Sequence, residues 1–277
     1  EDYTNRGNLI TPLKDRIDSQ ILTHYPRTLE EAIEITAQEA WIHRNGREMV
    51  IPQYFREIIE CIAFEARKSE FVDQKSGVSA RLTISAMENL ISNAERRAIL
   101  LKDSVIVPRI CDLPHTLPGL TGKIELVFEG EQEGPVKISK ALIGKAVREV
   151  FRKYFPDPLE RRQKTHGDHK TLPLESEYAA VIGWFEGGNR IEVSDDMTVT
   201  DYHKELDRVK GLRELTKKHM KIAETDKAGL ASSMEFVLDG LHQSSRIAKD
   251  EVDHVTAYKD LVQSIFTGKG KAYEEDL

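Results

Sequence analysis

The sequence has 277 residues, of which 39% are hydrophobic and 31% charged, so the chain can form one large domain or a few small ones. The net charge of −7 argues against a protein that holds nucleic acid through its overall field. No apolar stretch is long enough to span a membrane, and the polar N-terminus does not resemble a signal peptide. The expected location is therefore the cytoplasm. The lack of an initial methionine suggests a piece of a longer protein.

The two cysteines also favour a cytoplasmic location. Cys61 and Cys111 sit in unrelated sequence contexts and give no disulfide framework. We expect both to be small buried hydrophobes in a reducing compartment.

The first part of the chain predicts a compact helical unit. A short strand is expected from Gln20 to His24, and the capping box Thr28-Leu-Glu-Glu31 opens a helix that should run to about Ala40. Pro52 opens a second helix and, after a polar loop, a third helix is expected over residues 79–101. The apolar residues of these two helices follow a 3.6-residue period. They are Phe55, Ile58, Ile59, Ile62, Ala63 and Ala66 in the second, and Ile84, Met87, Leu90, Ile91, Ala94 and Ala98 in the third.

The second part mixes prolines, glycines and helical patterns. We expect a strand from Ile124 to Phe128 and then a helix capped by Ser139. The apolar face of this helix carries Ile143, Val147, Val150, Phe151 and Tyr154. Residues 157–173 are charged and predict a linker. Beyond it, the apolar runs 180–185 and 190–193 flank two glycines and predict a β-hairpin, although a wider loop also fits. Two long helices are expected at about 201–222 and 230–250, followed by a polar tail.

Signatures of nucleotide hydrolysis are missing from the chain. A phosphate-binding loop needs two glycines, a lysine and a hydroxyl at fixed spacing. The run from Leu117 to Ile124 lacks the first glycine and the hydroxyl, and the run from Gly268 to Lys271 also fails. No apolar strand ends in Asp-Glu.

Other chemistry has weak support. His166 and His169, with Asp168 between them, have the spacing of a metal-ligand pair but no third ligand nearby, and they fit a solvated loop better. Neither cysteine has a histidine partner in the sequence, and no Gly-x-Ser-x-Gly motif occurs, so nucleophilic catalysis has no candidate.

Two stretches carry a specific resemblance. The first is Thr4-Asn-Arg-Gly-Asn-Leu-Ile-Thr-Pro-Leu-Lys-Asp-Arg16, and the second is Ser76-Gly-Val-Ser-Ala-Arg-Leu-Thr83. The first resembles the segment after the sensor-1 strand in magnesium-chelatase subunit I and MoxR-like AAA+ ATPases. In that family a Leu-x-Asp-Arg motif supplies the arginine finger, and here it reads Leu13-Lys-Asp15-Arg16. The second stretch resembles the start of the lid helix that carries the sensor-2 arginine, which corresponds to Arg81.

The chemistry of arginine fits these roles. A guanidinium is always charged, and its planar donors match phosphate oxygens. Arg81 lies where a loop becomes a helix, so free backbone amides lie beside it. Other readings stay open: Arg16 could pair with Asp15 or Asp18 or be simply exposed, and basic residues such as Lys68 are common near Arg81.

The resemblance implies a mainly α fold in which an AAA+ helical lid precedes a largely helical C-terminal region with a small β-hairpin. Residues 1–27 would end the α/β core, 28–104 would form the lid, 105–173 a strand-helix extension and linker, and 174–277 the C-terminal domain. The resemblance is useful over about residues 1–105 and looser beyond them, where the chain departs from the porphyrin-metallating subunits.

The implied function is a motor that couples ATP hydrolysis to remodelling or metal-loading of a partner protein. Its cofactor would be ATP with Mg²⁺, bound mostly by residues outside this chain. The family implies a homo-oligomer, usually a hexameric ring, and often a partner with a von Willebrand factor A domain. Arg16, with Asp15, would act on a neighbouring subunit's nucleotide, and Arg81 on its own. The alternatives are a helical interaction scaffold or a transcription-regulator module with a lid-like fold.

Overall fold

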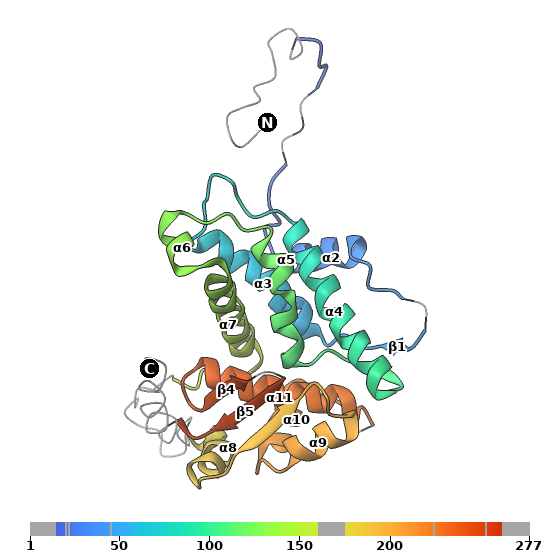
Figure 1. Ribbon diagram of the computed structural model, residues 1–277, viewed down its shortest axis with the longest axis vertical. Coiled ribbons are helices and arrows are strands. Elements are labelled where there is room, and N and C mark those ends of the chain that lie inside the picture. Colours follow the sequence, from blue (N-terminus) through green and yellow to red (C-terminus); the bar gives the residue numbers. More distant parts are fainter. Residues whose placement is uncertain are drawn as a thin grey trace, which may run out of the picture.

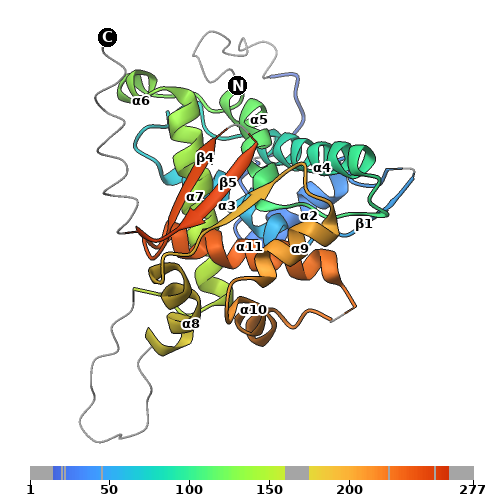
Figure 2. The same ribbon diagram turned by 60° about the horizontal axis from the view of Figure 1, so that its bottom comes forward.

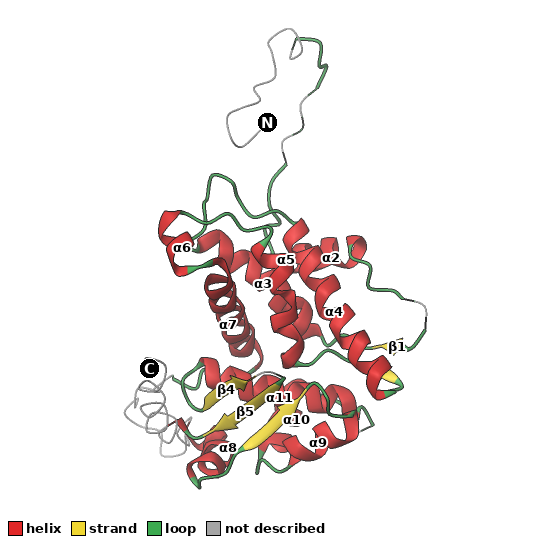
Figure 3. Ribbon diagram, in the orientation of Figure 1, coloured by secondary structure: helices red, strands yellow, loops and turns green. Residues whose placement is uncertain are grey.

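The computed structural model describes residues 15–159, except residues 20, 22 and 45, and residues 175–261, except residues 224 and 253. The fold is mainly helical with a small antiparallel sheet (Figures 1 and 3). The helices are α2 (Leu29–Glu39), α3 (Gln53–Lys68), α4 (Arg81–Leu101), the 3-10 helix η1 (Ile110–Thr116), α5 (Leu117–Thr121), α6 (Phe128–Glu133), α7 (Pro135–Tyr154), α8 (Glu175–Glu186), α9 (Val199–Asp207), α10 (Leu212–Met220) and α11 (Lys227–Gln243).

The strands form two small sheets. β1 (Glu48–Met49) pairs in parallel with β2 (Val105–Ile106). β3 (Ile191–Ser194), β4 (Ala248–Val252) and β5 (Val255–Lys259) form an antiparallel sheet in the order β3-β5-β4. Figure 2 shows this sheet lying over α11, with α9 beside β3. β4 and β5 thus form a β-hairpin, in place of the one expected from residues 180–185 and 190–193.

The predicted helical stripes are buried. All six apolar positions predicted for α3 have no exposed surface, and five of the six predicted for α4 are at most 3% exposed. Thr28 caps α2 as expected, since its Oγ1 accepts a hydrogen bond from the Glu31 backbone N–H at 3.2 Å. In a capping box the Glu31 carboxylate would accept a hydrogen bond from the backbone N–H of Thr28. Here Glu31 Oε2 accepts instead from the backbone N–H of Arg27, one residue earlier.

The core is continuous across the chain. α7 packs against both α3 and α11, and one cluster of buried apolar residues runs from Ala40 to Tyr258. α11 is buried on all its faces, which its small residues permit. The Tyr54 hydroxyl lies 2.7 Å from Ser232 Oγ, and Ser232 donates to the Pro108 carbonyl at 2.6 Å. The last three of the four predicted segments thus share one core, and the limits of all four stay a prediction.

Several predicted elements are wrong. Residues 124–128 form no strand: Leu126 makes a single bridge to Val72, and α6 begins at Phe128. α7 begins at Pro135 after Gly134, so Ser139 is buried inside the helix and does not cap it. Residues 180–185 belong to α8, so they cannot form a hairpin with 190–193.

The expected last helices are also corrected. The first is interrupted at Gly211, whose φ of +82° ends the turn between α9 and α10. The second ends at Gln243, and residues 248–250 enter β4. The described residues of the expected strand from Gln20 to His24 lie in no strand, and Gln20 itself lies outside the described residues.

Other sequence features fall outside the described residues. They are Leu13, His166, Asp168, His169, the run Gly268 to Lys271 and most of the predicted linker. Within the described residues no helix is long and apolar enough to cross a membrane. Both cysteines are free and partly buried.

Candidate functional site

Arg81 is the first residue of α4, and its side chain is exposed. Its backbone N–H donates to Ser79 Oγ at 3.2 Å, but no side chain caps the helix at Ala80. The guanidinium forms no hydrogen bond or ion pair with any residue that the structure describes. A cation with free donors therefore lies at the positive end of a 21-residue helix. An anion placed there would meet both the guanidinium and the helix N-terminus.

The loop before α4 is fixed by a clamp that we define as Tyr25, Arg67 and Val78. The Arg67 guanidinium lies over the Tyr25 ring, 4.1 Å from its centroid, and donates to the Val78 carbonyl at 3.2 Å. The Val78 N–H donates to the Tyr25 hydroxyl at 3.0 Å. Gly77 makes this approach possible: its φ is +72°, and a Cβ there would lie 2.2 Å from the Tyr25 hydroxyl oxygen. The clamp ties the N-terminal segment to the start of α4.

A second polar group lies beneath the first turn of α4. Thr36 of α2, Glu60 of α3 and Thr83 of α4 are all buried, and Thr36 Oγ1 lies 2.5 Å from Glu60 Oε1 and 2.9 Å from Thr83 Oγ1. Burial raises the pKa of Glu60 to about 7, although the two hydroxyls and Arg67 act in the opposite direction. This carboxyl therefore changes charge near neutral pH.

Asp15 and Arg16 lie apart from this site. Both are exposed in the N-terminal segment, which stands away from the helices in Figure 1. No described contact brings Arg16 to Arg81, so the structure does not join the two predicted arginines within one chain. Ile17 and Ile21 in the same segment are 48% and 87% exposed.

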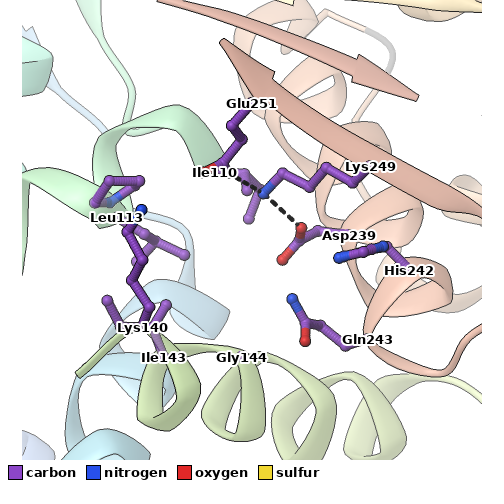
Figure 4. A pocket seen from close by; sticks show the side chains of 11 residues that line it. Ile110, Leu113, Lys140, Ile143, Gly144, Asp239, His242, Gln243, Lys249 and Glu251 are labelled. Atoms are coloured by element: carbon purple, nitrogen blue, oxygen red, sulfur yellow. Dashed lines mark hydrogen bonds and ion pairs between the residues drawn. The ribbon is translucent and has the colours of Figure 1, made fainter. Parts of the chain in front are cut away.

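The chain also has a cavity of about 240 Å³, far from the predicted site residues in sequence (Figure 4). η1, α7, α11 and β4 surround it. Lys249 reaches into it and pairs with Asp239 at 2.9 Å and Glu251 at 2.7 Å. Lys140 on α7 also lines the cavity, so its two lysines equal its two carboxylates in number. With its charges already cancelled, the cavity favours neither anions nor cations. Among the described residues no group of three His, Cys, Asp or Glu side chains could hold a metal ion.

The sequence predicted that Arg81 lies at the start of a helix, but it did not reveal the residues that support this helix start. Tyr25, Arg67 and Glu60 meet only in three dimensions, and no spacing along the chain signals the contact. The one available signal was Thr36, which follows Ala32 by one helical turn on the buried face of α2. A polar residue on a buried face needs a partner.

Comparison with known proteins gives no family: no family model, curated protein or solved structure matches the chain.

Proposed function

We propose that the chain is the lid and C-terminal region of a magnesium-chelatase-like AAA+ ATPase, in which Arg81 contacts the phosphates of bound ATP. The observation that carries the proposal is the exposed guanidinium at the N-terminus of α4, which has no partner among the described residues. Most buried arginines of the described chain are already engaged; Arg97, for example, pairs with Asp112. Arg81 is free to bind a ligand, and its position suits an anion.

The clamp supports the same proposal. It links α4 to the segment that carries Asp15 and Arg16. A change in the position of the lid would therefore move α4 and the residues that precede Tyr25 together. In the proposed ring, Arg16 reaches the γ-phosphate of a neighbouring subunit, and Asp15 helps to orient it. The exposed Ile17 and Ile21 would be covered by the α/β core or by that neighbour. Mg²⁺ would accompany ATP, and a protein with a von Willebrand factor A domain would be the partner.

Nucleotide binding by Arg81 variants tests the proposal in a protein that carries the phosphate loop. Arg81→Ala removes one charge-assisted contact, worth roughly 1.5–3 kcal/mol, so ATP affinity should fall about ten- to a hundredfold. Arg81→Lys should recover little, because the planar fork is lost. Arg47→Ala is the matched control: Arg47 is exposed too, but it precedes β1, near the other end of α4, roughly 30 Å away by the length of the helix. Unchanged affinity in Arg81→Ala would favour the interaction scaffold or the regulator module instead.

Mixed rings test the role of Arg16. Arg16→Ala should bind ATP nearly normally but hydrolyse it roughly 10³–10⁵-fold more slowly, as expected for a lost arginine finger. Subunits that lack the phosphate-loop lysine but retain Arg16 should restore turnover when mixed with Arg16→Ala subunits. No recovery, with mixed rings shown by mass measurement, would refute action on a neighbour.

A further inference from the structure

A chain of buried hydrogen bonds connects α3 through α2 to the first turn of α4. Its links are Glu60 to Thr36, Thr36 to Thr83, and Thr83 to the Ala80 carbonyl, where Thr83 Oγ1 lies 3.0 Å from the oxygen. The three side chains are each 2–3% exposed, so water does not complete the chain from outside. Ala80 is the residue before Arg81, and the chain therefore ends at the backbone that carries Arg81.

Counting hydrogens distinguishes two states of this chain. Three contacts each need one hydrogen, but the two threonine hydroxyls supply only two. If Glu60 is ionised, it only accepts: Thr36 donates to the carboxylate, and the single Thr83 hydrogen can go to the carboxylate, to Thr36 or to the Ala80 carbonyl. If Glu60 carries a proton, Glu60 donates to Thr36, Thr36 to Thr83, and Thr83 to Ala80. Every contact is then a hydrogen bond.

The surroundings allow both states. The charged groups that face Glu60 in the described structure are Arg67 and Arg56, both on α3; Arg56 lines the same small gap between the helices. α2 and α4 face it with Thr36 and Thr83. Burial raises the pKa of Glu60 to about 7, and the positive charge of Arg67 offsets only part of that rise.

We infer that the proton on Glu60 holds the first turn of α4 in place, so that Glu60 is a positioning residue for Arg81. This inference rests on the proposed function only for the final step, the contact of Arg81 with phosphate. Loss of the proton leaves three acceptors (the Glu60 carboxylate, Thr36 and the Ala80 carbonyl) for the one Thr83 hydrogen, so the bond to Ala80 forms less often and the first turn opens more often. The lid arginine is then less well placed for a nucleotide.

Hydrogen exchange of the backbone amides of residues 82–84 tests the first step without any nucleotide. The pKa of Glu60 is higher in the closed state than in the open state. The stabilisation that its proton gives to the closed first turn is therefore complete below pH 4.5 and is lost as the pH rises toward 7. If opening exposes Glu60 fully, the opening constant rises up to about twentyfold from pH 5.5 to pH 7.5, after correction for intrinsic exchange. Glu60→Gln should abolish this rise, because the amide can donate to Thr36 at every pH.

Two further variants make the test specific. Glu57→Gln is the matched control, since Glu57 is also on α3 and 3% exposed but pairs with Lys153; it should keep the wild-type pH dependence. Thr83→Val cuts the chain at its last link, so residues 82–84 should exchange faster than in the wild type at both pH values. An equal pH dependence in wild type and Glu60→Gln would overturn the inference.

ATP affinity separates this inference from the proposed function. In a protein that carries the phosphate loop, the affinity ratio of Glu60→Gln to wild type cancels the titration of ATP itself. The ratio should be higher at pH 7.5 than at pH 5.5. A flat ratio together with the expected exchange behaviour would refute the Arg81–phosphate contact, and leave the control of the first turn intact. A pH-independent exchange pattern would refute the inference whatever the ratio.

Discussion

The crossing of α7 and α11 depends on the absence of a side chain at Gly240. A Cβ added there would lie 2.2, 2.4 and 2.7 Å from three atoms of the Phe151 ring, where ordinary contacts begin at 3.4 Å. The Phe151 ring has no exposed surface and cannot swing away. The Phe155 ring stacks on it with the two centroids 4.8 Å apart, and the Phe236 ring packs edge-on against it with the centroids 6.0 Å apart. The two helices would have to separate by about 1 Å.

Gly240→Ala should therefore destabilise the protein. Overpacking of a core costs roughly 1–3 kcal/mol, and the crowded ring places this site at the upper end. The better helix propensity of alanine offsets about 1 kcal/mol. The expected net loss is about 1–2 kcal/mol. Gly183→Ala is the matched control: Gly183 also lies inside a helix, but a Cβ there meets nothing within 4 Å. That variant should gain about 0.5–1 kcal/mol.

Urea unfolding followed by far-ultraviolet circular dichroism measures both changes. Shortening the obstructing ring should relieve the crowding, so Phe151→Leu combined with Gly240→Ala should lose less than the sum of the two single changes. If Gly240→Ala gained the same stability as Gly183→Ala, the close approach of α7 and α11 would be refuted.

Three smaller predictions concern other contacts. Arg97→Ala leaves the Asp112 carboxylate, which has no exposed surface, without its ion pair, so the free energy of unfolding should fall by roughly 3–5 kcal/mol; a loss under about 1 kcal/mol would contradict the pairing. Tyr25→Phe removes the hydrogen bond to the Val78 N–H, so trypsin should cut the N-terminal segment faster, whereas an unchanged rate would show that the clamp does not restrain it. Burial raises the pKa of the Cys61 thiol to about 12, so Ellman's reagent at pH 8 should modify it much more slowly in the folded protein than in the unfolded chain, and equal rates at this position would contradict the raised pKa.

The helices of the first part were predictable because each carries a clear period. The six apolar residues predicted for the buried face of α3 all have no exposed surface, although Glu57 and Glu60 are buried on the same helix. The error at α8 has a physical cause. Its residues Val181 and Phe185 favour strands, and the two glycines after it favour a hairpin turn. The same residues, with Tyr178, are spaced by three and four, and all are at most 1% exposed. Packing on a helix decided the outcome.

The hairpin formed by β4 and β5 was not predicted, because β4 is rich in charged residues. β4 reads Ala-Lys-Asp-Glu-Val, with exposed residues at most positions, and such a sequence also suits the end of a helix. The candidate site, too, was predictable only in part. The position of Arg81 at a helix start followed from a local motif. The hydrogen-bonded chain beneath it joins residues 24 and 47 positions apart on different helices, and a local pattern carries no information about such contacts.

The hydrogen bond between Tyr54 and Ser232 has a consequence for how the protein is made. The two residues are 178 positions apart, so at a ribosomal rate of about 5–20 residues per second Tyr54 emerges roughly 10–35 s before its partner is synthesised. During that interval α3 can pack against α2 and α4, but it lacks α7 for part of the time and α11 throughout, so the part of its apolar face that packs on α7 stays uncovered. The nascent chain then exposes a row of isoleucine and phenylalanine side chains of the kind that chaperones bind. Slow codons after α4 would lengthen this exposure and lower the yield of folded protein.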